Sequence, residues 1–195
     1  MRLISERISF DETKKPTIVI LGKTERWKES MLLFWVLAWS FCGAVFLYYF
    51  FADTPMRYSL QMLLMLSFWA YFEIRIVKVF IWRRVGFERV TYSIEELIIQ
   101  NNFYGRGKKN KYFINNIESF QLITSSPTNF FAFMDNSFWV MGAHRIYFDY
   151  FGKKVVFGMQ LNDLEAKKLL SILNGQLKKS KKEIRKKQEK THDKI

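Results

Sequence analysis

The chain has 195 residues and a formal net charge of +13, which is enough length for one ordinary domain and a further segment. A single cysteine, Cys42, excludes an intramolecular disulfide. Neither of the two histidines has a Cys or a second His at metal-ligand spacing, so we expect no metal site and no other cofactor. No catalytic Ser, His and Asp set stands out, and we therefore do not expect an enzyme.

Residues 1–30 form a basic segment that we predict to be a cytoplasmic N-terminal arm. The first residues are charged but are not followed by the apolar stretch of a cleaved signal peptide. The mean hydropathy of the whole chain, −0.09, hides a division between this polar arm, a very apolar part over 31–82, and a polar, basic remainder.

Two apolar runs follow the arm and predict a transmembrane hairpin. The run 31–51 contains no charge, and it is long enough for a bilayer core, which needs about 20 helical residues. A soluble helix of this length would show a polar stripe. After a short turn over 52–57 that contains Pro55, the second run, 58–82, gains its charges near the far end.

Basic residues predict the orientation of this hairpin. They are frequent in the arm and again over 75–89, whereas the connector offers only Arg57. The positive-inside rule then places both termini in the cytoplasm of a cell with an inner membrane.

Two features of the hairpin could do more than anchor the chain. Trp35 and Trp39 are four residues apart on one helix face, and Trp69 lies at a similar predicted depth. They either pack within the hairpin or form a docking face for another membrane protein. Glu73 has no basic residue three or four positions away, so it is either a carboxylate at headgroup depth or has a partner elsewhere.

The segment 83–177 predicts a compact cytoplasmic domain. Short alternating runs rich in β-branched and aromatic residues, such as "RVTYSI" and "HRIYFDY", are strand signals at close spacing. They predict an antiparallel sheet that curls into a sandwich or small barrel. Asn162 and Glu165 resemble a capping box, and an apolar stripe from Ala166 to Leu177 predicts a helix that closes this sheet.

The tail, 178–195, carries nine Lys/Arg and three Asp/Glu. It either prolongs the helix into solvent or is disordered. We do not expect it to bind nucleic acid, because no aromatic residues are interleaved with its lysines.

Two further stretches of the domain are candidate contact sites. Four basic residues, Arg106, Lys108, Lys109 and Lys111, gather in one turn; this is either a solvated loop or a contact for anionic headgroups or an acidic partner. The stretch 129–141, with Phe131, Phe133 and Trp139, is apolar on both strand faces. It is either a buried strand or a loop that enters lipid or a partner.

The whole plan resembles bacterial membrane proteins with pleckstrin-homology-like (PH-like) domains. The resemblance covers about 25–178 and is carried by "WRRVGFERVTYSIEELIIQNNFYGRGKKNKYFINNIESFQL" and by the helix after "VVFGMQLND". The photosystem I assembly factor of chloroplasts and cyanobacteria is similar in plan. The resemblance implies an α+β membrane protein with a two-helix hairpin, a PH-like domain and a C-terminal helix, but it carries over no site residues.

These features together predict a non-catalytic inner-membrane protein. It would serve as an accessory subunit, scaffold or assembly factor of a larger membrane complex, with the anionic cytoplasmic leaflet and other membrane subunits as partners. The alternative is a membrane-tethered sensor that binds anionic headgroups or an acidic ligand through the basic turn.

Overall fold

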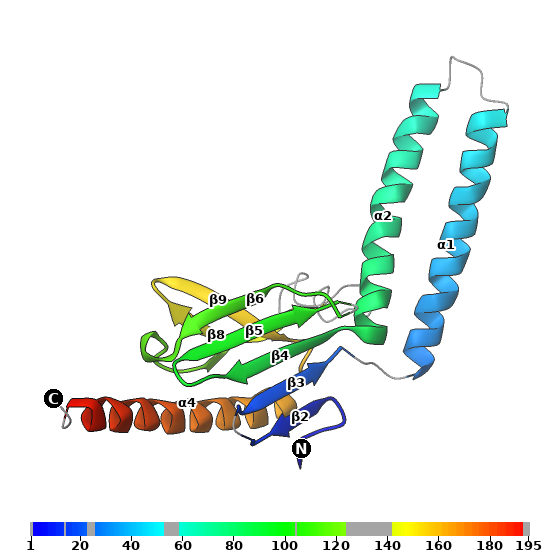
Figure 1. The fold of residues 1–195 in the computed structure, drawn as a ribbon. Helices are drawn as coiled ribbons and strands as arrows, with labels where there is room; N and C mark the ends of the chain where they lie inside the picture. The colour runs from blue at the N-terminus through cyan, green and yellow to red at the C-terminus, as the bar shows by residue number, and fades with distance from the viewer. Residues whose placement is uncertain are drawn as a thin grey trace.

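A computed structural model describes residues 2–13, 15–22, 26–52, 59–103, 105–123 and 142–192. The fold is mixed α+β: two antiparallel sheets, a pair of long helices and a C-terminal helix (Figure 1). In chain order the elements are β1 (Arg2–Leu3), β2 (Ile8–Asp11), β3 (Thr17–Leu21), α1 (Arg26–Ala52), α2 (Ser59–Val85), β4 (Phe87–Tyr92), β5 (Glu96–Asn102), β6 (Lys109–Phe113), the 3₁₀ helix η2 (Ile114–Asn116), β7 (Gln121–Leu122), β8 (His144–Tyr150), β9 (Lys153–Met159) and α4 (Asp163–His192).

The larger sheet contains the N-terminal segment. Its strand order is β1-β2-β3-β4-β5-β6, and β3 pairs antiparallel with β4, so that Ile18 lies opposite Val90. The helix pair α1–α2 is therefore inserted between two neighbouring strands of one sheet. We predicted an arm outside the domain for 1–30, whereas three of its segments, 2–3, 8–11 and 17–21, are strands of this sheet. The runs "ISFD" and "TIVIL" have inward-facing apolar residues that complete the core.

The core lies between the two sheets and α4. Alternate residues of β4 and β5, among them Val90, Tyr92 and Leu97, face inward and are fully buried, as the period of two of a strand requires. The smaller sheet, β7-β8-β9, contributes Phe148 and Phe157. Both side chains are fully buried in the core.

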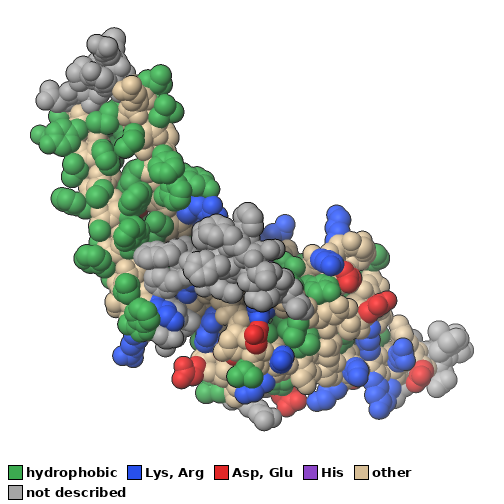
Figure 2. Space-filling model, turned by 180° about the vertical axis from the view of Figure 1, so that it is seen from behind, with side chains coloured by type: hydrophobic (Ala, Val, Ile, Leu, Met, Phe, Trp, Pro, Cys, Tyr) green, Lys and Arg blue, Asp and Glu red, His purple; other side chains and the backbone are tan. Residues whose placement is uncertain are grey.

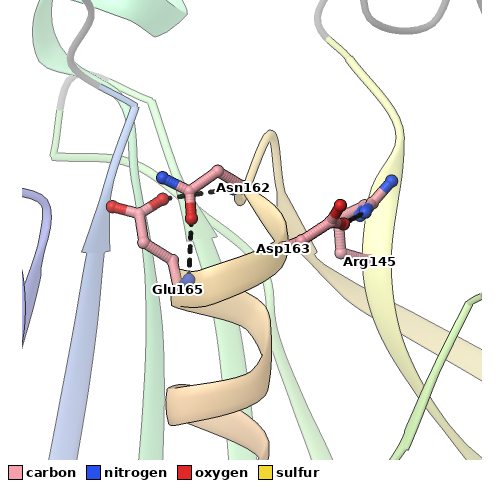
Figure 3. A network of polar contacts seen from close by, with 4 residues as sticks. All are labelled: Arg145, Asn162, Asp163 and Glu165. Atoms are coloured by element: carbon pink, nitrogen blue, oxygen red, sulfur yellow. Dashed lines mark hydrogen bonds and ion pairs between the residues drawn. The ribbon is translucent and has the colours of Figure 1, made fainter.

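Helix α4 begins at the predicted capping box and is longer than its predicted apolar stripe. The Glu165 N–H donates to Asn162 Oδ1 (2.7 Å), and the Asn162 N–H donates to Glu165 Oε2 (3.2 Å), while Asp163 pairs with Arg145 of β8 (Figure 3). The helix continues into the basic tail as far as His192. Ile184 packs on the core with only 4 % of its surface exposed, because it lies two turns after Leu177 on the same face.

Helices α1 and α2 run antiparallel beside each other and project away from the sheets (Figure 1). Glu29 pairs with Arg84 near the sheet, and Ser40 contacts Glu73 further along. One helix in the described part of the chain, α1, is long and apolar enough to cross a membrane. Helix α2 has the same length but carries five charged residues in its second half and does not reach that hydropathy.

Candidate functional site

The middle of the helix pair contains a small polar cluster. Ser40 Oγ donates to Glu73 Oε1 (2.6 Å), and the indole N–H of Trp69 donates to the backbone oxygen of Trp39 (3.0 Å). Gly43 lies directly against the Trp69 ring, where any Cβ would overlap the ring atoms. The Trp69 side chain therefore connects α2 to the backbone of α1, and both interpretations of the tryptophans stay predictions.

Glu73 is paired with a residue of the neighbouring helix. Its partner Ser40 comes nine residues after Met31, where the apolar run of α1 begins, and this corresponds to about 14 Å of helix. Glu73 Oε2 is buried and has no hydrogen-bond partner among the described residues. If the apolar run lies in lipid, this carboxyl is at mid-depth, and its partner is Ser40 of the neighbouring helix rather than water at headgroup depth.

Trp35 differs from the other two tryptophans because it faces outward. Its ring stacks on that of Trp39, with ring centroids 6.3 Å apart and planes inclined by 12°, and 44 % of its surface is exposed. It belongs to an extensive apolar surface that covers both helices (Figure 2). The large exposed side chains of this surface include Phe34, Leu37, Phe41, Tyr48, Phe51, Leu60, Leu64, Phe68 and Ile74. Soluble monomers rarely expose an apolar surface of this extent.

The helix pair is joined to the domain through Trp82, which is only 1 % exposed. Its ring contacts that of Phe103 after β5, with centroids 4.8 Å apart, and it fills the space beside Gly22 and Gly86, where a Cβ would collide with it. The Gly22 N–H donates to the Gly86 backbone oxygen (2.8 Å), which continues the β3–β4 ladder up to the helices. These contacts connect the helix pair to the end of the larger sheet.

A buried carboxylate, Glu88, lies close to this junction and was missed by the sequence analysis. Glu88 is fully buried and its Oε2 accepts the backbone N–H groups of Gly158 (2.7 Å) and Met159 (3.1 Å) in β9. Its Oε1 lies 3.7 Å from His144 Nδ1. The sequence does contain a sign of this buried carboxylate, since Glu88 occupies the inward-facing position of β4 two residues before Val90.

The surroundings of Glu88 shift the pKa of its carboxyl group. Burial raises the pKa of the Glu88 carboxyl above its ordinary range, while the two backbone N–H groups and the Arg7 guanidinium oppose this effect. Burial lowers the pKa of His144. Arg7 itself donates to the backbone oxygens of Leu21 and Gln160. The cluster therefore links β3, β4, β8 and the end of β9, and its geometry is that of a structural clamp.

The four residues of the basic turn are all exposed. Lys111 pairs with Glu96 across the β5–β6 ladder (3.0 Å), so its charge is partly compensated. The turn is held by the amide of Gln100, which donates to the Gly107 backbone oxygen (3.1 Å). Because Phe103 touches Trp82 at the start of this turn, Arg106 and Lys108 lie at the end of the sheet where the helices are attached.

The aromatic stretch with Phe131, Phe133 and Trp139 falls outside the described residues. Both interpretations of it, a buried strand or a contact loop, remain predictions. Within the described part of the chain, no three His, Cys, Asp or Glu side chains are placed so that they could hold a metal ion.

Comparison of the chain with protein-family models, with curated proteins and with solved structures gives no significant match.

Proposed function

We propose that the protein is a non-catalytic, two-helix membrane protein that serves as an accessory subunit, scaffold or assembly factor of a larger membrane complex. We also propose that both helices cross the inner membrane and that both termini are cytoplasmic. The single observation that carries it is the apolar surface of α1 and α2, whose large side chains are exposed in the described part of the chain.

The pairing of β3 with β4 supports the crossing by two helices. These strands flank the helix pair on either side in sequence and are neighbours in one sheet. If α1 crosses the bilayer, the chain has to return through α2 to place β4 beside β3. The charges in the second half of α2 lie toward the sheet, where long basic side chains reach the headgroups.

The arrangement of the domain supports a PH-like fold. An antiparallel meander is followed by a three-stranded sheet and a helix that covers the core, in the order that the resemblance implies. The extra strands β1 and β2 extend the meander at its N-terminal side. A domain of this kind, attached to the helices at Trp82, would present its edges to partners close to the bilayer.

Trp35 is the residue through which we expect the helices to dock. Replacing Trp35 by alanine should reduce the yield of co-purified membrane proteins about tenfold or more, because a large aromatic anchor in an interface is typically a hot spot. The measurement is a mild-detergent pull-down quantified by mass spectrometry. Trp27→Ala is the matched control, since Trp27 is also exposed but lies in the first turn of α1, before the apolar run. A wild-type chain that always purifies alone would contradict the scaffold function.

The position of the basic turn favours a second candidate function, the binding of anionic headgroups, because Arg106, Lys108 and Lys109 lie at the end of the sheet nearest the helices. Their joint replacement by glutamine should lower the preference of the reconstituted protein for spin-labelled phosphatidylglycerol over phosphatidylcholine several-fold, because each such charge contributes about 1 kcal/mol at most. Replacement of Lys167, Lys168 and Lys178, exposed lysines of α4, is the control. An unchanged preference in the first variant would reject this candidate.

A further inference from the structure

The turn between β8 and β9 has an unusual residue at its tip. Tyr150 pairs with Lys153, and the two residues between them both have positive φ, 50° at Phe151 and 73° at Gly152. This is the backbone of a two-residue hairpin turn, whose first position strongly favours Asn, Asp or Gly. A phenylalanine is strained there, and 76 % of its surface is exposed. The fold alone gives no reason for a large apolar side chain at this position.

Further exposed aromatic and basic residues lie around this turn. Phe113, at the end of β6, is 56 % exposed, and its N–H donates to the Tyr150 hydroxyl (3.3 Å). The Tyr150 and Phe151 ring centroids are 4.7 Å apart. Lys153 and Lys154 follow directly and are exposed; Asp149, opposite Lys154 in the ladder, is also exposed. Two exposed phenylalanines thus lie beside an excess of positive charge.

The turn lies on the side of the domain toward which the helices project. In Figure 1 the helices rise from one end of the sheets, α4 runs along the opposite side, and the β8–β9 turn is at the far end of the domain on the helix side. The space-filling view from behind shows basic, acidic and apolar side chains along the upper edge of the domain (Figure 2). In this arrangement, with Trp82 packed at the junction, a bilayer crossed by the helices would extend over this edge.

We propose that the β8–β9 turn is a second membrane contact: Phe151, with Phe113 beside it, enters the headgroup region of the bilayer that the helices cross, and Lys153 and Lys154 contact anionic lipids. This inference rests on the proposed membrane insertion of α1 and α2. The occupant is lipid rather than protein because the contact combines exposed aromatic side chains with lysines, the composition that favours an anionic membrane interface, and because the bilayer is the surface that the helices bring to it.

A fluorescent probe at the turn tests this contact in the full chain. In a Cys42→Ser background, Phe151→Cys is labelled with an environment-sensitive dye and the protein is reconstituted into vesicles of phosphatidylcholine with added phosphatidylglycerol. We expect blue-shifted emission and quenching by nitroxide-labelled lipids, and we expect both to weaken in the Lys153→Gln/Lys154→Gln variant. Leu164→Cys is the control, because Leu164 is also an exposed apolar residue but lies in α4 on the opposite side. A probe at position 151 that stays as water-exposed as the one at 164 overturns the proposal.

Further outcomes distinguish this proposal from its premise and from a protein occupant. If the reconstituted chain is extracted by carbonate, the membrane insertion itself fails. If it resists extraction and the probe at position 151 is shielded only in native membranes and not in protein-free vesicles, the occupant is a protein and the lipid contact is overturned. A Phe151→Asn variant should have a higher Tm, because Asn adopts this backbone readily. In the same variant, Phe113→Cys can carry the dye. If that dye stays shielded from water without Phe151, then Phe151 is not the residue that inserts into the bilayer.

Discussion

Replacing Glu88 by alanine is expected to lower the free energy of unfolding by about 3–5 kcal/mol, because two buried backbone N–H groups would lose their acceptor at once. The donors are Gly158 and Met159 at the end of β9. Glu88→Gln is the matched control. Its amide oxygen can accept from the same two groups, so we expect a loss of only about 1 kcal/mol. Chemical unfolding followed by circular dichroism in micelles would measure both values, and equal losses would refute the clamp.

The same pair of proteins should differ in their dependence on pH. Burial holds the pKa of Glu88 above its value in the unfolded chain, so its stabilising contribution is complete below the unfolded pKa and is lost as pH rises through the folded pKa. Glutamine does not titrate, and the Glu88→Gln protein should lack this decline. The pKa of His144 is lowered by burial, so its contribution is lost as pH falls, but both proteins keep His144 and Arg7. The difference between their unfolding free energies therefore isolates Glu88.

Local patterns in the sequence predicted those parts of the fold that depend on neighbouring residues. The reciprocal hydrogen bonds of Asn162 and Glu165 could be predicted from a spacing of three, and the inward faces of β4 and β8 from alternation. The inclusion of the N-terminal segment could not be predicted in this way. Thr17 lies opposite Thr91, 74 residues later in the chain, and no local signal states which distant strand a short run such as "TIVIL" will pair with.

In the candidate site, too, some features follow from the local sequence and others only from the three-dimensional arrangement. Hydropathy indicated an apolar helix pair, but the depth of Glu73 depends on the register of α2 against α1, which the contacts of Ser40 and Gly43 determine. The basic turn was visible as a cluster of charges. Its position beside Trp82, and the position of Phe151 on the side toward which the helices project, required the three-dimensional arrangement.

The second large effect is expected from a substitution of Gly43, which lies where the register of the helix pair is set. Gly43→Ile should destabilise the pairing of α1 and α2 by about 2–4 kcal/mol, because the new side chain would occupy the volume of the rigid Trp69 ring and remove the hydrogen bond from its indole to the Trp39 backbone oxygen. The free energy of unfolding in mixed detergent micelles, followed by tryptophan fluorescence, is the measurement.

Ala44→Ile is the control for Gly43→Ile. It adds a similar side chain one residue later, where α1 is exposed, and an added apolar group facing lipid or detergent should change stability little. If both variants lose the same amount, the loss comes from the β-branched side chain in the helix and not from the contact with Trp69. If Gly43→Ile alone unfolds early, Trp69 and Gly43 set the register that places Glu73 beside Ser40, and the depth of that carboxyl in the helix pair follows from their packing.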